Sequence, residues 1–263
     1  MATWFELHLV TDDTAYAGQA AVEAFTLVDR LEALLSRYRE DSEISQIGRL
    51  EPGEHLRLGE ATFTCLRLAL DLRAETGGAF DPTLGHLGRL VLFPDERIVQ
   101  CENSPVHLDL GAIGKGFALD LVATHLREWE LPRALLVAGG SSLLALDGPS
   151  DGTDWELRLT KRQSIWISHT AIGASGPAVK GAHIIDPRSG EPCQRHARTW
   201  ACASSAAAAD ALSTAWMLLD REEIETVCAR RPETGGALLA NETRPEAIEC
   251  FGGFPQPVYN SAK

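Results

Sequence analysis

The sequence is poor in basic residues and has no long hydrophobic run. Lysine and arginine number 24 against 37 aspartates and glutamates, so the formal net charge is −13. Nucleic acids and anionic membranes need a basic face on a protein partner, so this balance argues against both. No apolar stretch approaches the roughly 20 residues of a membrane-spanning helix, and we expect no membrane insertion. Any phosphate that the chain binds must be held locally, by backbone amides, a lysine or a metal ion.

Targeting signals and paired cysteines are also missing. The start, MATWFELHLV, lacks the basic and long apolar segments of a signal peptide and carries no lipobox, so we expect a cytoplasmic protein. The six cysteines lie far apart, without a CxxC pair or clustered histidines. This spacing favours reduced, mostly buried thiols over a zinc site. The length of 263 residues suits one domain, residues 1–263, or two interlocked lobes of it.

Hydrophobic periodicity predicts a mixed α/β fold. Apolar residues at helical spacing alternate with short apolar or alternating runs that are typical of strands. Glycine turns after two of these runs indicate βα units, whereas the middle of the chain indicates an antiparallel meander. The expected helices are residues 16–35, a short helix capped by Ser42, 60–76, 117–129, 204–219 and one from Arg221; the expected strands are 3–10, 98–101, 106–110, 134–138, 155–160, 164–168 and 237–240.

The stretch Leu108–Asp120, LDLGAIGKGFALD, carries the strongest chemical signal. An apolar run breaks into a turn that contains Gly111, Lys115 and Gly116, and a helix follows. Such a turn lets backbone amides approach an anion, and the helix adds its positive N-terminal end. The spacing is that of neither a Walker loop nor a dinucleotide-binding motif. A phosphate site and an ordinary βα turn therefore both remain open.

The helix over 204–219 offers oxygen ligands on one face. Asp210 and Thr214 stand four positions apart, and Ser213 is one residue round the helix. Hard oxygen ligands on a rigid element suit Mg²⁺, which takes few protein oxygens and completes its coordination with phosphate and water. From the residues alone, a metal site and an ordinary structural helix face both remain open.

Three further side chains have two readings each. Tyr38 is either a stacking platform for an aromatic ligand or a half-buried structural tyrosine. Asp81, held extended by the following proline, either caps the next turn or points into a site. His183 either moves a proton, with Arg188 stabilising the turn or an anion, or is hydrogen-bonded locally.

Six runs, in their order along the chain, resemble the FAD:protein FMN transferase family, called ApbE. The resemblance covers nearly the whole chain and implies an α/β, T-fold-like architecture with mixed sheets flanked by helices. It also implies an enzyme that binds FAD and Mg²⁺, attaches FMN through a phosphoester to a threonine of a target flavoprotein, and releases AMP. The runs are Leu34–Tyr38 with Asp41–Ile44, Gly78–Thr83, Asp109–Asp120, Ala138–Gly140, His183–Gly190 and Ala209–Ala215.

The resemblance also implies roles for individual residues. The implied FAD contacts are Tyr38, Ala79, Phe80, Asp81, Asp109, Lys115 and Ile185, with Met1 as a further one; the implied metal ligands are the carbonyl of Ala112 with Asp210, Ser213 and Thr214; the implied catalytic residue is His183.

The chain departs from the family pattern after the paired glycines, where Ser141 replaces an aspartate of many relatives. Two other functions stay open. The protein could hold FAD without transferring FMN, or it could be a Mg²⁺-dependent FAD pyrophosphatase in which water replaces the threonine.

Overall fold

The structure is a computed structural model that describes residues 3–85, 89–103, 106–176, 184–193, 195–241 and 248–259. Within these ranges, the largest sheet has seven strands, all paired antiparallel, in the order β1-β5-β6-β9-β12-β13-β14. The strands are β1 (Phe5–Leu9), β5 (Ala134–Ala138), β6 (Ser142–Ala145), β9 (Thr170–Ser175), β12 (Arg198–Ala203), β13 (Gly235–Leu239) and β14 (Ile248–Gly252).

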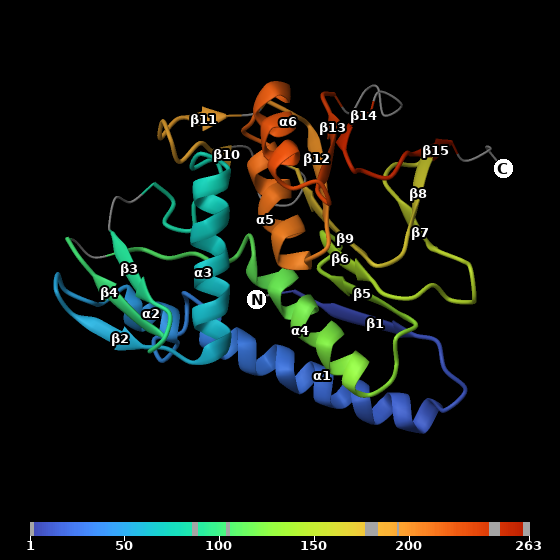
Figure 1. The fold of residues 1–263 in the computed structure, drawn as a ribbon, viewed down its shortest axis with the longest axis horizontal. Helices are drawn as coiled ribbons and strands as arrows, with labels where there is room; N and C mark the ends of the chain where they lie inside the picture. The colour runs from blue at the N-terminus through green and yellow to red at the C-terminus, as the bar shows by residue number, and fades with distance from the viewer. Residues whose placement is uncertain are drawn as a thin grey trace.

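Helices α4 (Gly114–Glu128) and α5 (Ala206–Trp216) pack on one face of this sheet (Figure 1). Helix α1 (Thr14–Leu35) packs outside α4, and α3 (Glu60–Glu75) packs against α5. These helices bury the apolar stripes that their sequence periodicity indicates, since alanine, valine and leucine recur at helical spacing. In α1 the buried residues are Ala17, Ala20, Ala24, Val28, Leu31 and Leu35.

The opposite face of the sheet is covered by a smaller sheet of β7 (Trp155–Arg158), β8 (Gln163–Ile167) and β15 (Val258–Tyr259). A second apolar cluster, which includes Ile165, Ile172 and Trp200, fills the space between them. Antiparallel sheets commonly build a core in this way, with one face of each turned inward.

The remaining elements lie around this centre. Strands β2 (His55–Arg57), β4 (Ile98–Cys101) and β3 (Leu90–Phe93) form a sheet near α2 (Glu43–Ile47), at the left of Figure 1. Strands β10 (Ile184–Ile185) and β11 (Pro192–Cys193) form a hairpin, and α6 (Arg221–Arg230) follows α5. Ser42 caps α2 by accepting a hydrogen bond from the Ser45 N–H, as predicted.

Two glycines let α5 approach its neighbours closely. A Cβ at Gly116 would collide with the carbonyl oxygen of Ala206, and a Cβ at Gly173 would collide with that of Ala209. The backbone of α5 therefore rests directly on the start of α4 and on β9. This packing brings Asp210 beside the glycine turn.

The expected mixed α/β class is confirmed, but the βα units expected at the glycine turns are wrong. Residues 106–110 belong to no strand; Val106, Leu108 and Leu110 are buried in the main core, and the N–H of Asp109 donates to Pro82 O. Burial of alternate residues against helices imitates a strand pattern here. The second turn joins β5 to β6 in a hairpin, because Gly139 and Gly140 both have positive φ angles.

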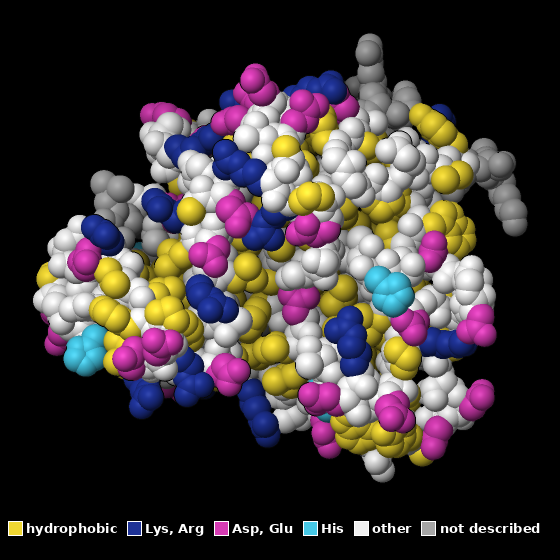
Figure 2. Space-filling view, in the orientation of Figure 1, with side chains coloured by type: hydrophobic (Ala, Val, Ile, Leu, Met, Phe, Trp, Pro, Cys, Tyr) yellow, Lys and Arg dark blue, Asp and Glu magenta, His cyan; other side chains and the backbone are white. Residues whose placement is uncertain are grey.

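The remaining features are the surface charge, the helices of the described residues as candidate membrane spans, and the cysteines. The face shown in Figure 2 carries acidic and basic side chains interspersed with apolar ones. In the described part of the chain, no helix combines the length and apolar character needed to cross a bilayer. All six cysteines lie in the described residues as free thiols, four of them buried, which confirms that expectation.

Candidate functional site

Lys115 and Asp210 meet at the centre of the site, although 95 positions separate them. Lys115 lies in the first turn of α4, and Asp210 lies in the middle of α5. The Nζ atom of Lys115 is 3.1 Å from both carboxylate oxygens of Asp210 and 3.3 Å from the carbonyl oxygen of Gly111. Oxygens of the glycine turn and of the late helix thus converge on one cationic group.

Asp210 is almost completely buried, and its carboxylate is held by further donors. The N–H of Gly116 donates to Oδ2 over 3.2 Å, and the hydroxyl of Ser142 donates to Oδ1 over 2.9 Å. Burial raises the pKa of this carboxyl group, while Lys115, Ser142 and Gly116 act in the opposite direction. The contacts offset part of the cost of placing a carboxylate in the interior, and the pKa stays above its ordinary value.

Three hydroxyl groups lie next to Asp210. Ser213 and Thr214 donate to the Asp210 carbonyl oxygen, over 2.8 Å and 3.4 Å. The Oγ of Ser175, at the end of β9, is 2.9 Å from Ser213 Oγ and 3.4 Å from Thr214 Oγ1. The late helix therefore adds hydroxyl groups beside the backbone of Asp210 to the carboxylate that faces the turn.

This donor set fits a hard cation. Among the described residues there is no group of three or more His, Cys, Asp or Glu side chains that could hold a metal. A Mg²⁺ ion here would therefore rely on one carboxylate with hydroxyl and carbonyl oxygens, and on phosphate and water for the rest. The Lys115 ammonium already lies between oxygens of both elements, and Ala112 follows Gly111 directly in the turn.

Asp109 organises the glycine turn. Its Oδ1 accepts a hydrogen bond of 2.8 Å from the N–H of Gly111, and its Oδ2 lies 3.4 Å from Nε of Arg37. Arg37 in turn donates to the hydroxyl of Tyr38. A continuous series of contacts therefore leads from Tyr38 through Asp109 to Lys115.

Tyr38 is 81% exposed, so the reading of it as a half-buried structural tyrosine is wrong. The Arg37 guanidinium lies 4.8 Å from its ring centroid. Both side chains border an open groove of about 410 Å³ whose floor includes Ile44, Val106 and Leu108. The exposed ring is available to an aromatic ligand.

The Ala79–Asp81 segment turns its side chains inward. Ala79 and Phe80 are buried in the core. Asp81 accepts hydrogen bonds from the N–H and hydroxyl of Thr83 and pairs with Arg73 Nε at 3.0 Å. Of its two readings, the structure shows the turn-capping one, and all three residues of this segment are buried.

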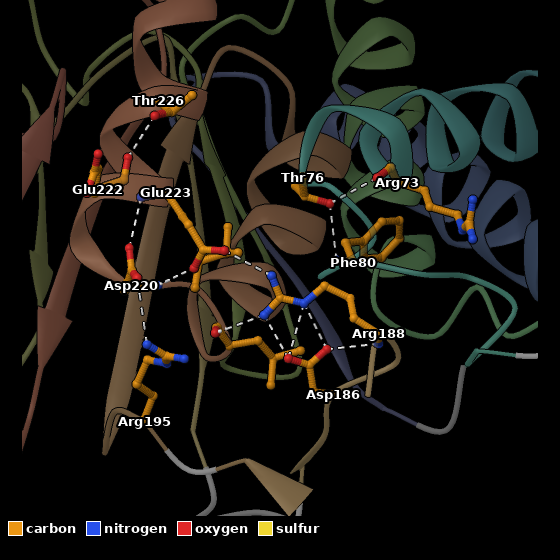
Figure 3. Close-up of polar contacts among 12 residues, drawn as sticks. Arg73, Thr76, Phe80, Asp186, Arg188, Arg195, Asp220, Glu222, Glu223 and Thr226 are labelled. Carbon is orange, nitrogen blue, oxygen red and sulfur yellow. Dashed lines mark hydrogen bonds and ion pairs between the residues drawn. The ribbon is translucent and has the colours of Figure 1, made fainter. Parts of the chain in front are cut away.

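Arg188 fastens the β10–β11 hairpin to the junction of α5 and α6 (Figure 3). Its guanidinium donates to both oxygens of Asp186, to Glu223 at 3.0 Å and to the carbonyl oxygen of Leu218 at 3.3 Å. These contacts lower the pKa of Asp186. Arg188 therefore stabilises the turn, and Ile185 stands in the same hairpin with 58% of its surface exposed. His183 and Met1 lie outside the described residues.

The hairpin also lies beside the Gly77–Gly85 loop. A Cβ at Gly85 would come within 2.9 Å of the carbonyl oxygen of Pro187, and one at Gly78 would lie 3.6 Å from Arg188 Cγ. The structure thus brings the Ala79–Asp81 segment near the hairpin that carries Ile185.

A second carboxylate, that of the half-buried Asp120 in α4, anchors the start of α5. It accepts hydrogen bonds from Ser205 Oγ at 2.8 Å, Ala206 N at 2.7 Å and Ala207 N at 2.9 Å. Burial raises the pKa of Asp120 above its ordinary value, and these donors offset only part of that rise. Asp120 fixes the position of the helix that carries Asp210.

Sequence reasoning missed Ser142 and Ser175. Both are polar residues at the ends of otherwise apolar strands, and Ser142 is 1% exposed. A buried polar residue needs a partner, so a serine at the end of an apolar strand indicates a polar contact nearby. Which partner each finds depends on strand register, which the sequence does not display.

The fold and the site together define an α/β protein in which a lysine of a glycine turn meets oxygen atoms of a late helix. The chain belongs to the ApbE family, whose profile matches residues 1–239. This membership confirms the resemblance drawn from the sequence runs and the expectation of a transferase enzyme.

Relatives and solved structures agree with this membership. The chain is 26% identical over 242 residues to the FAD:protein FMN transferase of Vibrio cholerae, covering 74% of this chain and 72% of the relative. It is 26% identical over 262 residues to that of Treponema pallidum, covering 78% and 72%. The flavin transferase ApbE structure from Vibrio cholerae has a TM-score of 0.78 at 20% identity, covering 95% of this chain and 94% of that one. The apbe protein of Thermotoga maritima has a TM-score of 0.77 at 21% identity, covering 95% and 97%. The solved structures support the fold.

Proposed function

We propose that this protein is a Mg²⁺-dependent FAD:protein FMN transferase that attaches FMN to a threonine of a flavoprotein and releases AMP. The observation that carries the proposal is the contact of Lys115 with Asp210, which joins an anion-binding turn to a helix bearing hard oxygen ligands. The names of the curated relatives support the choice of FAD as the substrate.

The FAD diphosphate would lie at the start of α4, where the positive end of the helix dipole and Lys115 would supply positive charge. Tyr38 would contact an aromatic ring of FAD, and Asp109 would hold the turn in shape. Ile185 and the backbone of Ala79–Asp81 would complete the FAD site, since the hairpin and that segment lie near each other.

The carbonyl of Ala112 and the side chains of Asp210, Ser213 and Thr214 would hold Mg²⁺. When bound, this ion supplies positive charge that neutralises the diphosphate oxygens. Lys115 supplies a second cation for the same oxygens, and burial around Asp210 strengthens such charge interactions.

The reaction needs one bond to form and one to break. The acceptor threonine Oγ bonds to the phosphorus of the FMN half, the bond from that phosphorus to the bridging oxygen breaks, and AMP leaves with that oxygen. The threonine proton goes to His183, our proposed general base, whose help would contribute about 10²- to 10⁴-fold. Lys115 would stabilise the charge that develops on the phosphoryl oxygens.

The test is to incubate the protein with FAD, Mg²⁺ and a threonine-bearing flavoprotein acceptor, and then to weigh the acceptor by mass spectrometry. The proposal predicts an acceptor heavier by one FMN moiety, with AMP released in equal amount. Free FMN and AMP with an unlabelled acceptor would instead identify a pyrophosphatase. Bound but intact FAD would identify a flavin-binding protein. A cytoplasmic location stays a prediction.

A further inference from the structure

We infer that Ser142 is a positioning residue that holds the Asp210 carboxylate in its ligand-binding orientation. This inference rests on the proposed function, because it assigns Asp210 a role in binding a divalent cation. Nothing in the family resemblance assigns a role to this serine.

Ser142 and Asp210 form a buried hydrogen bond. The Oγ of Ser142 lies 2.9 Å from Oδ1 of Asp210, and the two residues are 1% and 3% exposed. The hydroxyl therefore donates to a carboxylate in the protein interior. A neutral donor in this position fixes the direction of the carboxylate without adding a charge that would compete with a cation.

The pairing of the strands in the seven-stranded sheet positions Ser142 beside Asp210. Ser142 begins β6 directly after the glycine hairpin, and its strand partners are Ala138 on one side and Gly173 on the other. Gly173 is one of the glycines that let α5 rest on the sheet. Because Gly173 has no side chain, α5 lies close enough for Asp210 to reach the adjacent strand.

Ser142 would contribute most to holding the Asp210 carboxylate when Lys115 binds a diphosphate instead of Asp210. In the structure Oδ1 accepts from Ser142 and Lys115, and Oδ2 accepts from Gly116 and Lys115. If Lys115 turns to a diphosphate, Ser142 and the Gly116 N–H remain to hold the carboxylate. Loss of the hydroxyl would then leave Oδ1 without its protein donor.

The experiment compares Ser142→Ala with the wild type by titrating each with Mn²⁺ alone and following free Mn²⁺ by electron paramagnetic resonance. Outer-sphere hydrogen-bond partners of metal ligands change affinity by about 10- to 100-fold, so we expect Mn²⁺ binding to weaken by about 10-fold. In FMN transfer, the Mg²⁺ concentration for half-maximal rate should rise by a similar factor, while KM for FAD changes little.

Two further variants separate positioning from general loss of stability. Ser142→Thr keeps the hydroxyl and should restore most of the Mn²⁺ affinity. Ser164→Ala removes another hydroxyl that is 1% exposed, in β8 on the far side of the sheet, and should bind Mn²⁺ as the wild type does. Thermal unfolding of all three variants shows whether each is folded.

The outcomes are distinct. A loss in Ser142→Ala that Ser142→Thr restores supports the inference. Unchanged Mn²⁺ affinity in Ser142→Ala, or an equal loss in Ser164→Ala, overturns it. Failure of the wild type to transfer FMN would instead contradict the proposed function, and the Mn²⁺ titrations would still report on Ser142.

Discussion

The ammonium of Lys115 lies 3.1 Å from both carboxylate oxygens of Asp210, so one cation bridges the first turn of α4 and the middle of α5. The lysine side chain is 19% exposed and that of the aspartate 4%. The aspartate end of this ion pair is buried, so removing Lys115 leaves Asp210 as an uncompensated buried charge.

Replacing Lys115 by methionine should therefore reduce both activity and stability. We expect kcat/KM for FMN transfer to fall by at least about 10²-fold, because a positive charge on the phosphoryl oxygens is lost. The free energy of unfolding should fall by about 3 kcal/mol, because Asp210 keeps its burial without its ammonium. Steady-state kinetics and urea unfolding measure the two effects. Lys161→Met, an exposed lysine between β7 and β8, is the control and should leave both values unchanged.

Gly173→Ala should displace α5 from the sheet. Its new Cβ would collide with the carbonyl oxygen of Ala209, and such overpacking costs about 1 to 3 kcal/mol. Transfer activity should fall as well, because Asp210 moves with the helix. Gly18→Ala in α1 has no neighbour within 4 Å of the new Cβ and should stabilise the protein by up to about 1 kcal/mol. Equal unfolding midpoints for the two variants would contradict this packing.

Asp120→Ala should loosen the start of α5. The three hydrogen bonds that Asp120 accepts there would be lost, and losing such a helix cap costs about 1 to 2 kcal/mol. Hydrogen exchange should speed up most at the N–H groups of Ala206 and Ala207, because these donate to the carboxylate. Exchange at these amides that matches the wild type would show that Asp120 does not anchor the helix.

Arg188→Met should change how stability depends on pH. The hydrogen bonds from Arg188 lower the pKa of Asp186 in the folded state, so their contribution is present above the unfolded aspartate value of about 3.9. It is lost as the pH falls through and below that value. The wild type should exceed Arg188→Met by about 2 kcal/mol at pH 6, and the difference should shrink in acid.

Urea unfolding at a series of pH values measures this difference directly. Arg67→Met, an exposed arginine on α3, is the matched control and should show no such pH dependence. A difference between the wild type and Arg188→Met that is constant from pH 6 to pH 3 would contradict the assignment.

The sequence predicts the helices well, because their stability depends on an apolar stripe that periodicity displays. It also places Asp210 and Thr214 on one helix face, which helical geometry alone determines. Residues 106–110 were predicted wrongly as a strand, because alternate burial against helices gives the same pattern as strand pairing. The partners of Ser142 could not be predicted, since its contact with Asp210 depends on sheet register and on the packing allowed by Gly173.

The exposure of the single side chains Tyr38 and Asp81 also could not be predicted from the sequence. Tyr38 is exposed and Asp81 is turned inward, although both lie in short connecting segments outside helices and strands. Tyr38 contacts Arg37, which pairs with the distant Asp109, whereas Asp81 is held by Arg73 at the end of α3.

The most direct measurement is the anomalous diffraction of Mn²⁺ in crystals grown with FAD. The proposed site predicts a single strong peak within about 2.2 Å of an Asp210 carboxylate oxygen, with Thr214 Oγ1, the Ala112 carbonyl and the FAD diphosphate around it. A peak remote from Asp210, or FAD bound with Lys115 still on the carboxylate and no ion beside it, would contradict the site.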